Sequence, residues 1–429
     1  MTTVSTADPH IFANRESEAR SYCRTFDVRF TKAKGSYLHT DEGDKYIDFL
    51  AGCSSLNYGH NDDDMKAALI DHITADGIAH ALDMHTAVKA EFLQTFQDVI
   101  LKPRGLDYQL MFTGPTGANA VEAAMKLARK VTGRHNVIAF TNGFHGVTMG
   151  ALAATGNSYH REGGALPLQG VTRLPYDNYI DGVNSADVLE KMLGDASSGV
   201  DAPAAIMLET VQGEGGLNAA SPEFVKRVGE LAKKHGALFI IDDIQAGCGR
   251  TGTFFSFEEM GVTPDIVTMA KSISGFGLPM ALTLIKSEHD VFGPAEHNGT
   301  FRGNTHAFVT ATVALRKFWS DDTFQNEIKE KSELLTRRLT EFAGYFPGHK
   351  MKGRGMFQGV DVGSGETAAA VCKYCFEHGL VIETSGPNDE VVKVLAPLTT
   401  PVEVLEQGFA TMLDAARIVS AAPETIAAE

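Results

Sequence analysis

The segment at residues 237–247, ALFIIDDIQAG, decides the fold that this sequence predicts. Its first five residues are apolar and are followed at once by Asp242 and Asp243, which indicates a buried strand that ends in two carboxylates. Similar apolar strands are expected at residues 108–112, 136–140, 204–209 and 266–270. Helical patterns are expected at residues 118–131, at 222–235 and after Thr305. This alternation predicts βαβ units and a mostly parallel sheet in an α/β fold.

In parallel α/β sheets, ligands bind beyond the carboxyl ends of the strands, and this sequence has its unusual residues there. Thr116, Gly117 and Ala118 open the helix at residues 118–131, so free backbone N–H groups lie beside a glycine and a hydroxyl. Such a helix start suits a phosphate group, although an ordinary N-cap threonine would look the same. Lys271 directly follows the strand at residues 266–270.

Lys271 and Asp242 each allow two interpretations. A lysine among apolar neighbours can serve as an amine nucleophile, whereas a lysine at a strand end often just reaches solvent. Asp242 could hold a cation or a protonated ring nitrogen, or it could cap a helix. Together, a phosphate cradle, a strand-end acid and a strand-end lysine match the needs of pyridoxal 5'-phosphate. Its aldehyde forms a Schiff base with a lysine, and its ring nitrogen needs an acidic partner.

Two further motifs suggest other ligands. Residues 247–252, GCGRTG, fit the G-x-G-x-x-G pattern of dinucleotide-binding proteins, so a nucleotide-binding protein is the alternative from another class. That pattern should open a helix, and the continuation TFFSFEEMGVTPD is too rich in aromatic residues, glycine and proline to form one. Cys372, Cys375 and His378 lie in one expected helix, but a structural zinc site needs a second pair of ligands, so we expect no metal.

Composition and charge exclude several classes of function. The chain has 429 residues, with 38 basic and 54 acidic side chains, and its net charge is −16 with histidine neutral. This balance argues against a nucleic-acid partner, which calls for a basic surface. The N-terminus lacks the features of a signal peptide, and no apolar run approaches the ~20 residues of a membrane span, so we expect no membrane association. Five cysteines in a chain of this length indicate a reducing, cytoplasmic location.

Length and changes of pattern predict three segments. Residues 1–55 form an N-terminal arm and part of a small domain, residues 56–315 form a large cofactor-binding domain, and residues 316–429 form a C-terminal small domain. The C-terminal segment contains a charged amphipathic helix at residues 326–342. The two ends of the chain are therefore expected to share a smaller α+β domain.

The motifs above belong to a longer ordered set: TGANAVEAAMKLAR, NGFHGVT, LETVQGEGG, IIDDIQAGCGRTG, MAKSISGFGLPM, NGTFRGNT and KVLAPLTT. In this order they resemble the class III aminotransferases, a pyridoxal-phosphate family of fold type I, and the resemblance covers about residues 36–400. It implies a homo-oligomeric transferase with a mostly parallel central sheet. FTGPTGANAVEAA and LAGCSSLNYGHN are most similar to the diaminobutyrate–2-oxoglutarate transaminases, which open ectoine biosynthesis.

The resemblance implies a role for each matching residue around the cofactor. Lys271 would form the Schiff base, and Asp242 would pair with the pyridinium nitrogen. Gln245 would hydrogen-bond the ring oxygen, and Phe144 would stack on the ring. The residues that would bind the phosphate are Thr116, Gly117 and Ala118.

Other matching positions concern the substrate and the neighbouring subunit. Thr300 would reach the phosphate of the neighbouring subunit's cofactor, so the active unit would be at least a dimer. Glu214 matches an acidic gate beside the substrate. Lys393 and Val147 both stand where many relatives carry arginine, although Lys393 could still bind the α-carboxylate of glutamate. Because arginine offers a bidentate fork and lysine only a point charge, the residue that holds the distal substrate carboxylate is not identified.

The activity implied by the resemblance is transfer of the amino group of L-glutamate to L-aspartate 4-semialdehyde, giving L-2,4-diaminobutyrate and 2-oxoglutarate. 4-Aminobutyrate and ornithine are the alternative substrates, and the replacements at Val147 and Lys393 argue mildly against both. A siderophore is an alternative destination for the product. A mutase or a decarboxylase on the same fold remains open as an alternative chemistry.

Overall fold

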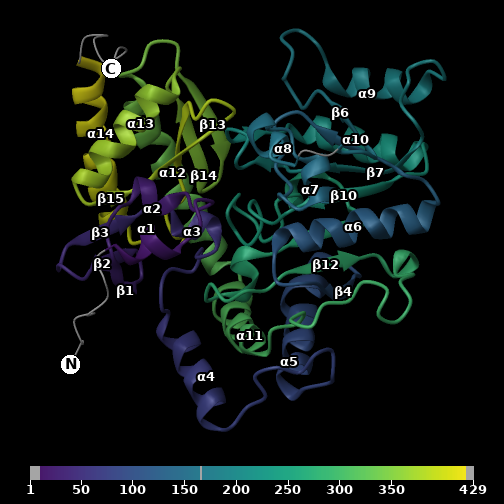
Figure 1. Ribbon diagram of the computed structural model, residues 1–429, viewed down its shortest axis with the longest axis horizontal. Coiled ribbons are helices and arrows are strands. Elements are labelled where there is room, and N and C mark those ends of the chain that lie inside the picture. Colours follow the sequence, from purple (N-terminus) through teal and green to yellow (C-terminus); the bar gives the residue numbers. More distant parts are fainter. Residues whose placement is uncertain (1–9, 165–166, 422–429) are drawn as a thin grey trace.

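The computed structural model describes residues 10–164 and 167–421, and its centre is a seven-stranded sheet (Figure 1). In spatial order the strands are β4 (Gln109–Phe112), β12 (Leu282–Ile285), β11 (Ile266–Met269), β10 (Leu238–Asp242), β7 (Pro203–Leu208), β5 (Asn136–Phe140) and β6 (Val171–Leu174). Strand β12 is antiparallel to both of its neighbours, and all other neighbours pair in parallel. The expected mostly parallel sheet is confirmed.

Alternate residues of β10 show how both faces of this sheet are covered. Leu238 and Ile240 join the apolar cluster of α6 (Gly117–Thr132), whereas Phe239 and Ile241 join the cluster of α10 (Pro222–Lys234). Successive side chains of a strand point to opposite faces, so the two helices lie on opposite sides of the sheet. Every residue of β10 is buried as a result.

Helix α6 begins and ends at its sequence signals. The Thr116 side chain accepts a hydrogen bond from the backbone N–H of Asn119, and Gly133 ends the helix in the left-handed conformation at φ +68°. Arg129 and Lys130 lie in the last turn, where cations stabilise the helix dipole. The caps fix the start of α6 at the carboxyl edge of the sheet.

Both ends of the chain contribute to the other side of the molecule (Figure 1). One sheet contains β1 (Phe30–Lys34), β2 (Tyr37–Thr40), β3 (Lys45–Asp48) and, from the C-terminal part, β15 (Leu380–Val381). An antiparallel sheet contains β13 (Lys350–Arg354), β14 (Phe357–Asp361), β17 (Val391–Val394) and β16 (Glu383–Ser385). Helices α12 (Thr323–Ala343) and α13 (Gly365–Glu377) pack on this second sheet, and α14 (Val402–Ala421) packs on them. The boundaries near residues 55 and 315 stay a prediction, and residues 1–9 and 422–429 lie outside the described residues.

The remaining elements are shorter or connect these layers. They are α1 (Ile11–Arg15), α2 (Tyr22–Thr25), α3 (Ala51–Ser54), α4 (Asp63–Thr74), α5 (Ala87–Thr95), α7 (Met149–Ala154), α8 (Ser158–Glu162), α9 (Ser185–Gly194), β8 (Val211–Gln212), β9 (Asn218–Ala219) and α11 (Thr305–Trp319). Five further helical turns complete the list: Phe96–Leu101, Lys102–Arg104, Glu258–Met260, Lys271–Ser274 and Ser287–His289. No helix of the described residues is long and apolar enough to cross a membrane.

The glycine-rich segment GCGRTG has a structural role. Cys248, Gly249 and Gly252 have φ angles of +51°, +89° and +113°, and a three-residue turn, rather than a full helix, is the next helical element. The loop places Arg250 in the core, where its guanidinium donates to Met356 O and Ala396 O and to the Asn57 side chain. A dinucleotide fingerprint needs a helix after its glycines, so this geometry does not support the nucleotide-binding alternative.

The cysteine pair of α13 does not form a metal centre. Cys372 and Cys375 are buried and free, and they pack in the apolar core of this side of the molecule. Within residues 10–164 and 167–421, no group of histidine, cysteine and acidic side chains could hold a metal ion.

Candidate active site

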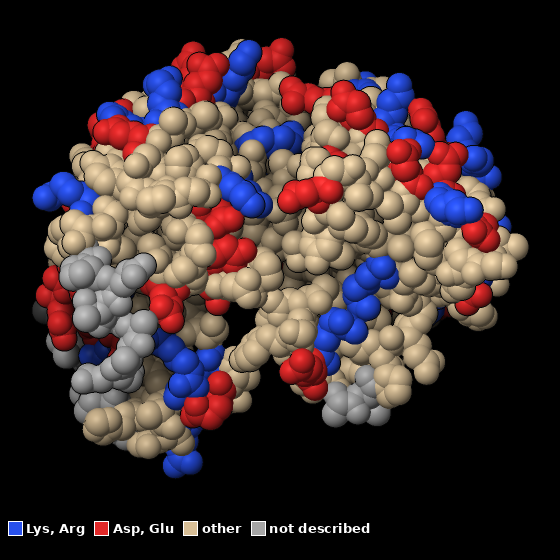
Figure 2. Space-filling model, turned by 90° about the horizontal axis from the view of Figure 1, so that it is seen from above, with Lys and Arg blue, Asp and Glu red and all other residues tan. Residues whose placement is uncertain are grey.

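One cavity of about 470 Å³ lies beyond the carboxyl ends of β10 and β11 and collects seven of the predicted residues. These are Thr116, Gly117, Ala118, Phe144, Asp242, Gln245 and Lys271. Seen from above, basic and acidic side chains are interspersed on the surface, and no continuous basic area covers this face (Figure 2). Because it lies beyond the carboxyl ends of the strands, the cavity is placed where an α/β sheet binds a small ligand.

Asp242 is fixed by three partners at the end of β10. Its Oδ2 lies 2.7 Å from His145 Nδ1, and its Oδ1 accepts from the Thr268 hydroxyl at 3.0 Å and from Ile244 N at 3.2 Å. Burial works to lower the pKa of His145, but its bond with Asp242 and the charges of Asp242 and Glu209 raise that pKa overall. A negative charge at Asp242 is thus held in place and directed at the cavity.

Lys271 begins the 3₁₀ turn Lys271–Ser274 with a φ of +53°, which non-glycine residues seldom adopt. The adjacent Ser272 holds this turn, because its hydroxyl donates to Ser54 O at 2.6 Å and accepts from Asn57 N at 3.0 Å. Unusual backbone of this kind persists only where the surroundings enforce it, and it is frequent at active sites. The amine of Lys271 is consequently presented to the cavity from a fixed turn.

The start of α6, where a phosphate cradle is predicted, lies at the cavity. Gly117 and Ala118 are the first residues of the helix, whose leading N–H groups have no partner within the helix. A Cβ atom on Gly117 would lie 3.0 Å from the Ile244 side chain, so a larger residue here would need that side chain to shift by a few tenths of an ångström. The ordinary N-cap interpretation of Thr116 is also correct, since its hydroxyl oxygen does cap the helix.

Glu209 is a cavity residue that the sequence analysis missed. It lies just beyond β7, and its Oε1 accepts a hydrogen bond from Phe144 N at 2.9 Å, which fixes the loop that carries the Phe144 ring. Burial raises the pKa of Glu209 to about 7. A carboxyl at the end of an apolar strand was the available signal, and the same reasoning that selected Asp242 would have found it.

A charged cluster lies next to Gln245, on the side of the antiparallel sheet. Gln245 Nε2 donates to Glu214 Oε1 at 3.1 Å, and Lys393 Nζ donates to the same oxygen at 3.1 Å. Lys393 is fully buried, and its Nζ also lies 2.9 Å from Glu383 Oε1. The structure thus brings the predicted Glu214 and Lys393 together and adds Glu383, which sequence reasoning missed.

The turn α3 completes the wall beside this cluster. Ala51, Gly52, Cys53 and Ser54 all have positive φ, from +46° to +68°, so this turn is left-handed. Asp48 Oδ1 holds it by accepting from Leu50 N and Ala51 N, at 2.8 Å each. Cys53 Sγ lies 2.7 Å from the Tyr22 hydroxyl and 3.9 Å from Glu383 Oε2. Burial raises the pKa of the Cys53 thiol to about 11.

Thr300 does not join the cavity within one chain. It is exposed on the loop that precedes α11, and the next residue, Phe301, is 68% exposed. Val147 lines the cavity and is 57% exposed, so it lies at its mouth. The structure of a single chain therefore leaves the predicted role of Thr300 untested.

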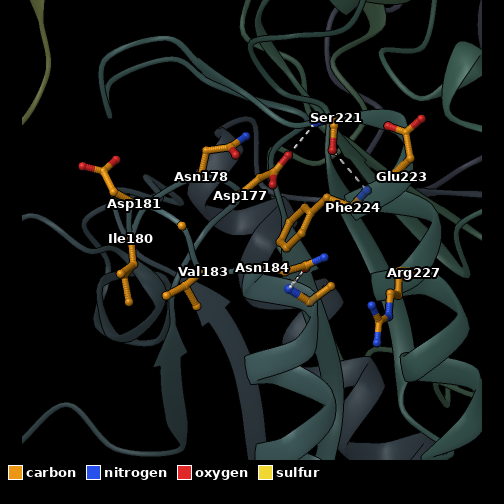
Figure 3. A pocket seen from close by; sticks show the side chains of 12 residues that line it. Asp177, Asn178, Ile180, Asp181, Val183, Asn184, Ser221, Glu223, Phe224 and Arg227 are labelled. Carbon is orange, nitrogen blue, oxygen red and sulfur yellow. Dashed lines mark hydrogen bonds between the residues drawn. The ribbon is translucent and has the colours of Figure 1, made fainter.

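A second cavity, of about 450 Å³, lies between the loop at residues 177–184 and the start of α10 (Figure 3). Three of its polar side chains bind the local backbone: Asp177 accepts from Ser221 N, Asn184 from Ala186 N and Ser221 from Phe224 N. None of the predicted site residues lines it. We therefore assign the chemistry to the first cavity.

The chain is similar in sequence to named relatives over almost its whole length. Residues 18–416 match the family Aminotransferase class-III. The chain is 55% identical over 410 residues to the diaminobutyrate–2-oxoglutarate transaminase of Halalkalibacterium halodurans, with 95% of this chain and 96% of that one covered. It is 56% identical over 401 residues to the enzyme of the same name from Vibrio cholerae, with 93% and 97% covered.

Solved structures show the same architecture. The ornithine aminotransferase of Toxoplasma gondii, described with partial occupancy of PLP at its active site, has a TM-score of 0.80 at 26% identity, with 95% of this chain and 93% of that one covered. A Bacillus anthracis aminotransferase has a TM-score of 0.83 at 24% identity, with 95% and 97% covered, and supports the fold.

Proposed function

The chain belongs to the class III aminotransferases, and from this premise we propose that it transfers the amino group of L-glutamate to L-aspartate 4-semialdehyde. The products are L-2,4-diaminobutyrate and 2-oxoglutarate. The observation that carries this proposal is the identity above 50%, over almost the full length, to relatives named diaminobutyrate–2-oxoglutarate transaminase. Ectoine synthesis is the use of the product that the family resemblance implies.

The cofactor is pyridoxal 5'-phosphate, which supplies an electron sink for the charge that develops on the substrate carbon. The residues of the cavity fit this group. Lys271 would hold the aldehyde, Asp242 the ring nitrogen, Gln245 the ring oxygen, and Phe144 the face of the ring. The start of α6, with the Thr116 hydroxyl, would hold the phosphate, and the leading N–H groups of this helix beside the cavity support the assignment.

Lys271 Nζ is the group that we propose to move the proton. As a neutral amine it accepts the proton from the substrate carbon that bears the amino group, and it later delivers that proton on the product side. Asp242 keeps its negative charge directed at the cavity because His145 and Thr268 hold both of its oxygens. The fixed turn at Lys271 keeps the amine in position for both transfers.

Glu214 and Lys393 are proposed to serve the carboxylate of glutamate. Glu214 lies in the turn between β8 and β9 and has a half-buried side chain, so it can leave Lys393 by a local movement. The α-carboxylate of glutamate would then take its place on Lys393. An aldehyde substrate has no carboxylate beside its reacting carbon, and Glu214 would stay on Lys393.

Class III aminotransferases are typically oligomeric, and we propose that Thr300 completes the phosphate site of a second copy. The loop that carries Thr300 adjoins exposed apolar side chains that suit an interface. They are Ile78, Leu82, Met84 and Phe301, each more than 50% exposed. The five free cysteines further support our proposal that the enzyme works in a reducing cytoplasm.

The assay that tests this function compares aldehyde acceptors with glutamate as the donor. Aspartate 4-semialdehyde should give diaminobutyrate with the highest kcat/KM, ahead of the aldehydes that yield 4-aminobutyrate and ornithine. A higher kcat/KM for either alternative would overturn the substrate assignment but leave the aminotransferase in place. Product analysis with labelled glutamate separates transfer from mutase or decarboxylase chemistry.

A further inference from the structure

Lys393 is shared by two carboxylates that differ in mobility. Glu383 on β16 lies directly opposite Lys393 on β17 in the antiparallel register, so this pair is built into the sheet. Glu214 reaches the same amine from the turn between β8 and β9. Glu214 can therefore exchange with a substrate carboxylate, whereas Glu383 keeps its place.

With both carboxyl groups ionised, the cluster contains one negative charge in excess, and burial raises the pKa of Glu383 against that state. Glu214, Glu383 and Lys393 contribute two carboxylates and one ammonium group; Lys393 and Glu383 are buried and Glu214 is half-buried. Lys271 is near enough for its charge to act on both carboxylates, but in the proposed function its amine is committed to the cofactor. A buried carboxylate without its own cation is costly, so the excess charge calls for a positive partner.

Glu383 is the carboxylate with unused acceptor capacity. It is 9% exposed, and the ion pair with Lys393 Nζ, at 2.9 Å, is the one polar contact of its Oε1 within the described residues. Its Oε2 has a thiol contact with Cys53 at 3.9 Å. An ionised carboxylate can accept about four hydrogen bonds, and buried groups that fall far short need an explanation.

The substrates of the proposed reaction supply such a partner. Diaminobutyrate and aspartate 4-semialdehyde both carry an α-ammonium group at the end of the chain away from the reacting carbon. 4-Aminobutyrate differs from diaminobutyrate by the absence of this one group. Gln245 lines the cavity of Lys271, and its Nε2 lies 3.4 Å from Cys53 O and 3.1 Å from Glu214 Oε1. The Glu383 cluster therefore adjoins this cavity directly behind Gln245.

We propose that Glu383 binds the α-ammonium group of diaminobutyrate and of aspartate 4-semialdehyde and thereby selects them over 4-aminobutyrate-type substrates. This inference rests on the proposed function. When Glu214 stays on Lys393, the excess charge of the cluster is available to the substrate's ammonium. Glutamate does not use it, since its amino group is the one transferred.

The test is the ratio of kcat/KM for diaminobutyrate to kcat/KM for 4-aminobutyrate, measured in the holoenzyme with 2-oxoglutarate as acceptor. We expect Glu383→Gln to lower this ratio at least tenfold, chiefly through a higher KM for diaminobutyrate, and Glu383→Asp to lower it less. Glu390→Gln removes a half-buried charge just before β17 of the same sheet and should leave the ratio unchanged. An unchanged ratio in a folded Glu383→Gln protein would overturn the inference.

A second measurement needs no variant, which matters if Glu383→Gln fails to fold. In the wild-type holoenzyme, 1,3-diaminopropane should compete with diaminobutyrate at least tenfold better than propylamine, because it carries a second ammonium group and no carboxylate. Equal competition would refute a site for that ammonium. A wild-type enzyme that does not turn over diaminobutyrate at all would instead refute the proposed function, so the two failures are distinguishable.

Discussion

Two buried carboxylates, one in the cavity of Lys271 and one in the neighbouring cluster of Lys393, are supported in different ways. Asp242, at the end of β10 in the central sheet, has hydrogen bonds from His145, Thr268 and Ile244. Glu383, on β16 of the antiparallel sheet, has one ion pair and a distant thiol. The two side chains are otherwise alike in being nine-tenths buried or more.

The number of hydrogen bonds to each carboxylate distinguishes a residue that stabilises charge during the reaction from a residue that binds a ligand. A group that stabilises developing charge works best when its orientation is fixed in advance, and the partners of Asp242 provide this. A group that recognises a ligand must keep acceptor capacity for it, and Glu383 does. Variants on the central-sheet wall should therefore abolish chemistry, whereas variants on the other wall should change the choice of substrate.

The largest effect is expected for Lys271→Ala, on the central-sheet wall. Its amine is the proposed attachment point of the cofactor and the carrier of the proton, and no neighbouring lysine occupies the cavity lining. Turnover should fall to background, and mass spectrometry after borohydride reduction should find no cofactor adduct. An adduct on another lysine, or a yellow and active variant, would contradict the assignment.

Asp242→Asn should cause the second-largest loss of turnover. The amide keeps the shape and accepts hydrogen bonds, but it removes the charge that faces the cavity. We expect kcat to fall about 10²–10³-fold with a smaller change in KM, as for other losses of fixed electrostatic stabilisation. Asp243→Asn is the matched control, because Asp243 accepts from Ser256 N on the core side and does not line the cavity. A loss of kcat in both variants would point to a folding defect.

The central-sheet wall could be predicted from the sequence because its residues follow directly on strong local patterns. Asp242 and Lys271 end apolar strands, and Thr116 caps a strongly amphipathic helix. Parallel strands place such ends along one edge, so three local signals converge on one site without any knowledge of distant contacts. His145 lies at the same edge and was missed because a single loop residue carries little signal, whereas Glu209 offered the same strand-end signal as Asp242 and was overlooked.

The other wall could not be predicted in the same way, because segments far apart in the sequence form it. Cys53 and Tyr22 reach Glu383 only because β15 pairs with β3, which joins residues near 47 to residues near 380. Periodicity does not specify such pairings. One signal was present: Glu383 directly follows the apolar run Leu380–Ile382, and a charge at that position favours a buried partner. Resemblance supplied Lys393 and Glu214, but not the second carboxylate.

Glu214→Gln probes the wall of Glu383 and should have an intermediate effect. Lys393 would then pair with Glu383 alone, and glutamate would no longer need to displace a carboxylate. We expect the KM for glutamate to fall roughly five- to tenfold, in line with the strength of a hydrogen bond to a charged group. Burial would raise the pKa of Glu214, but Lys393 and Lys271 lower it to about 2. The variant should therefore leave the shape of the pH–rate profile above pH 5 unchanged, and a shifted profile would contradict a purely ionic gate.

The smallest effect concerns stability at the central-sheet wall, where Asp243 lies behind Asp242. Burial raises the pKa of Asp243 from 3.8 to about 7, against the hydrogen bonds of Ser256 that lower it. Between about pH 4 and pH 7 the folded state then binds a proton that the unfolded state has lost, so stability falls as pH rises through this range. Asp243→Asn cannot lose a proton and should remove that slope, with a gain of at most about 4 kcal/mol above pH 7. Between pH 5 and pH 8, the melting temperature of the variant should rise by a few degrees relative to that of the wild type. The control Glu42→Gln, in an exposed turn, should keep the wild-type dependence of melting temperature on pH. A constant offset at every pH would mean that packing, and not the proton of Asp243, accounts for the difference between the two proteins.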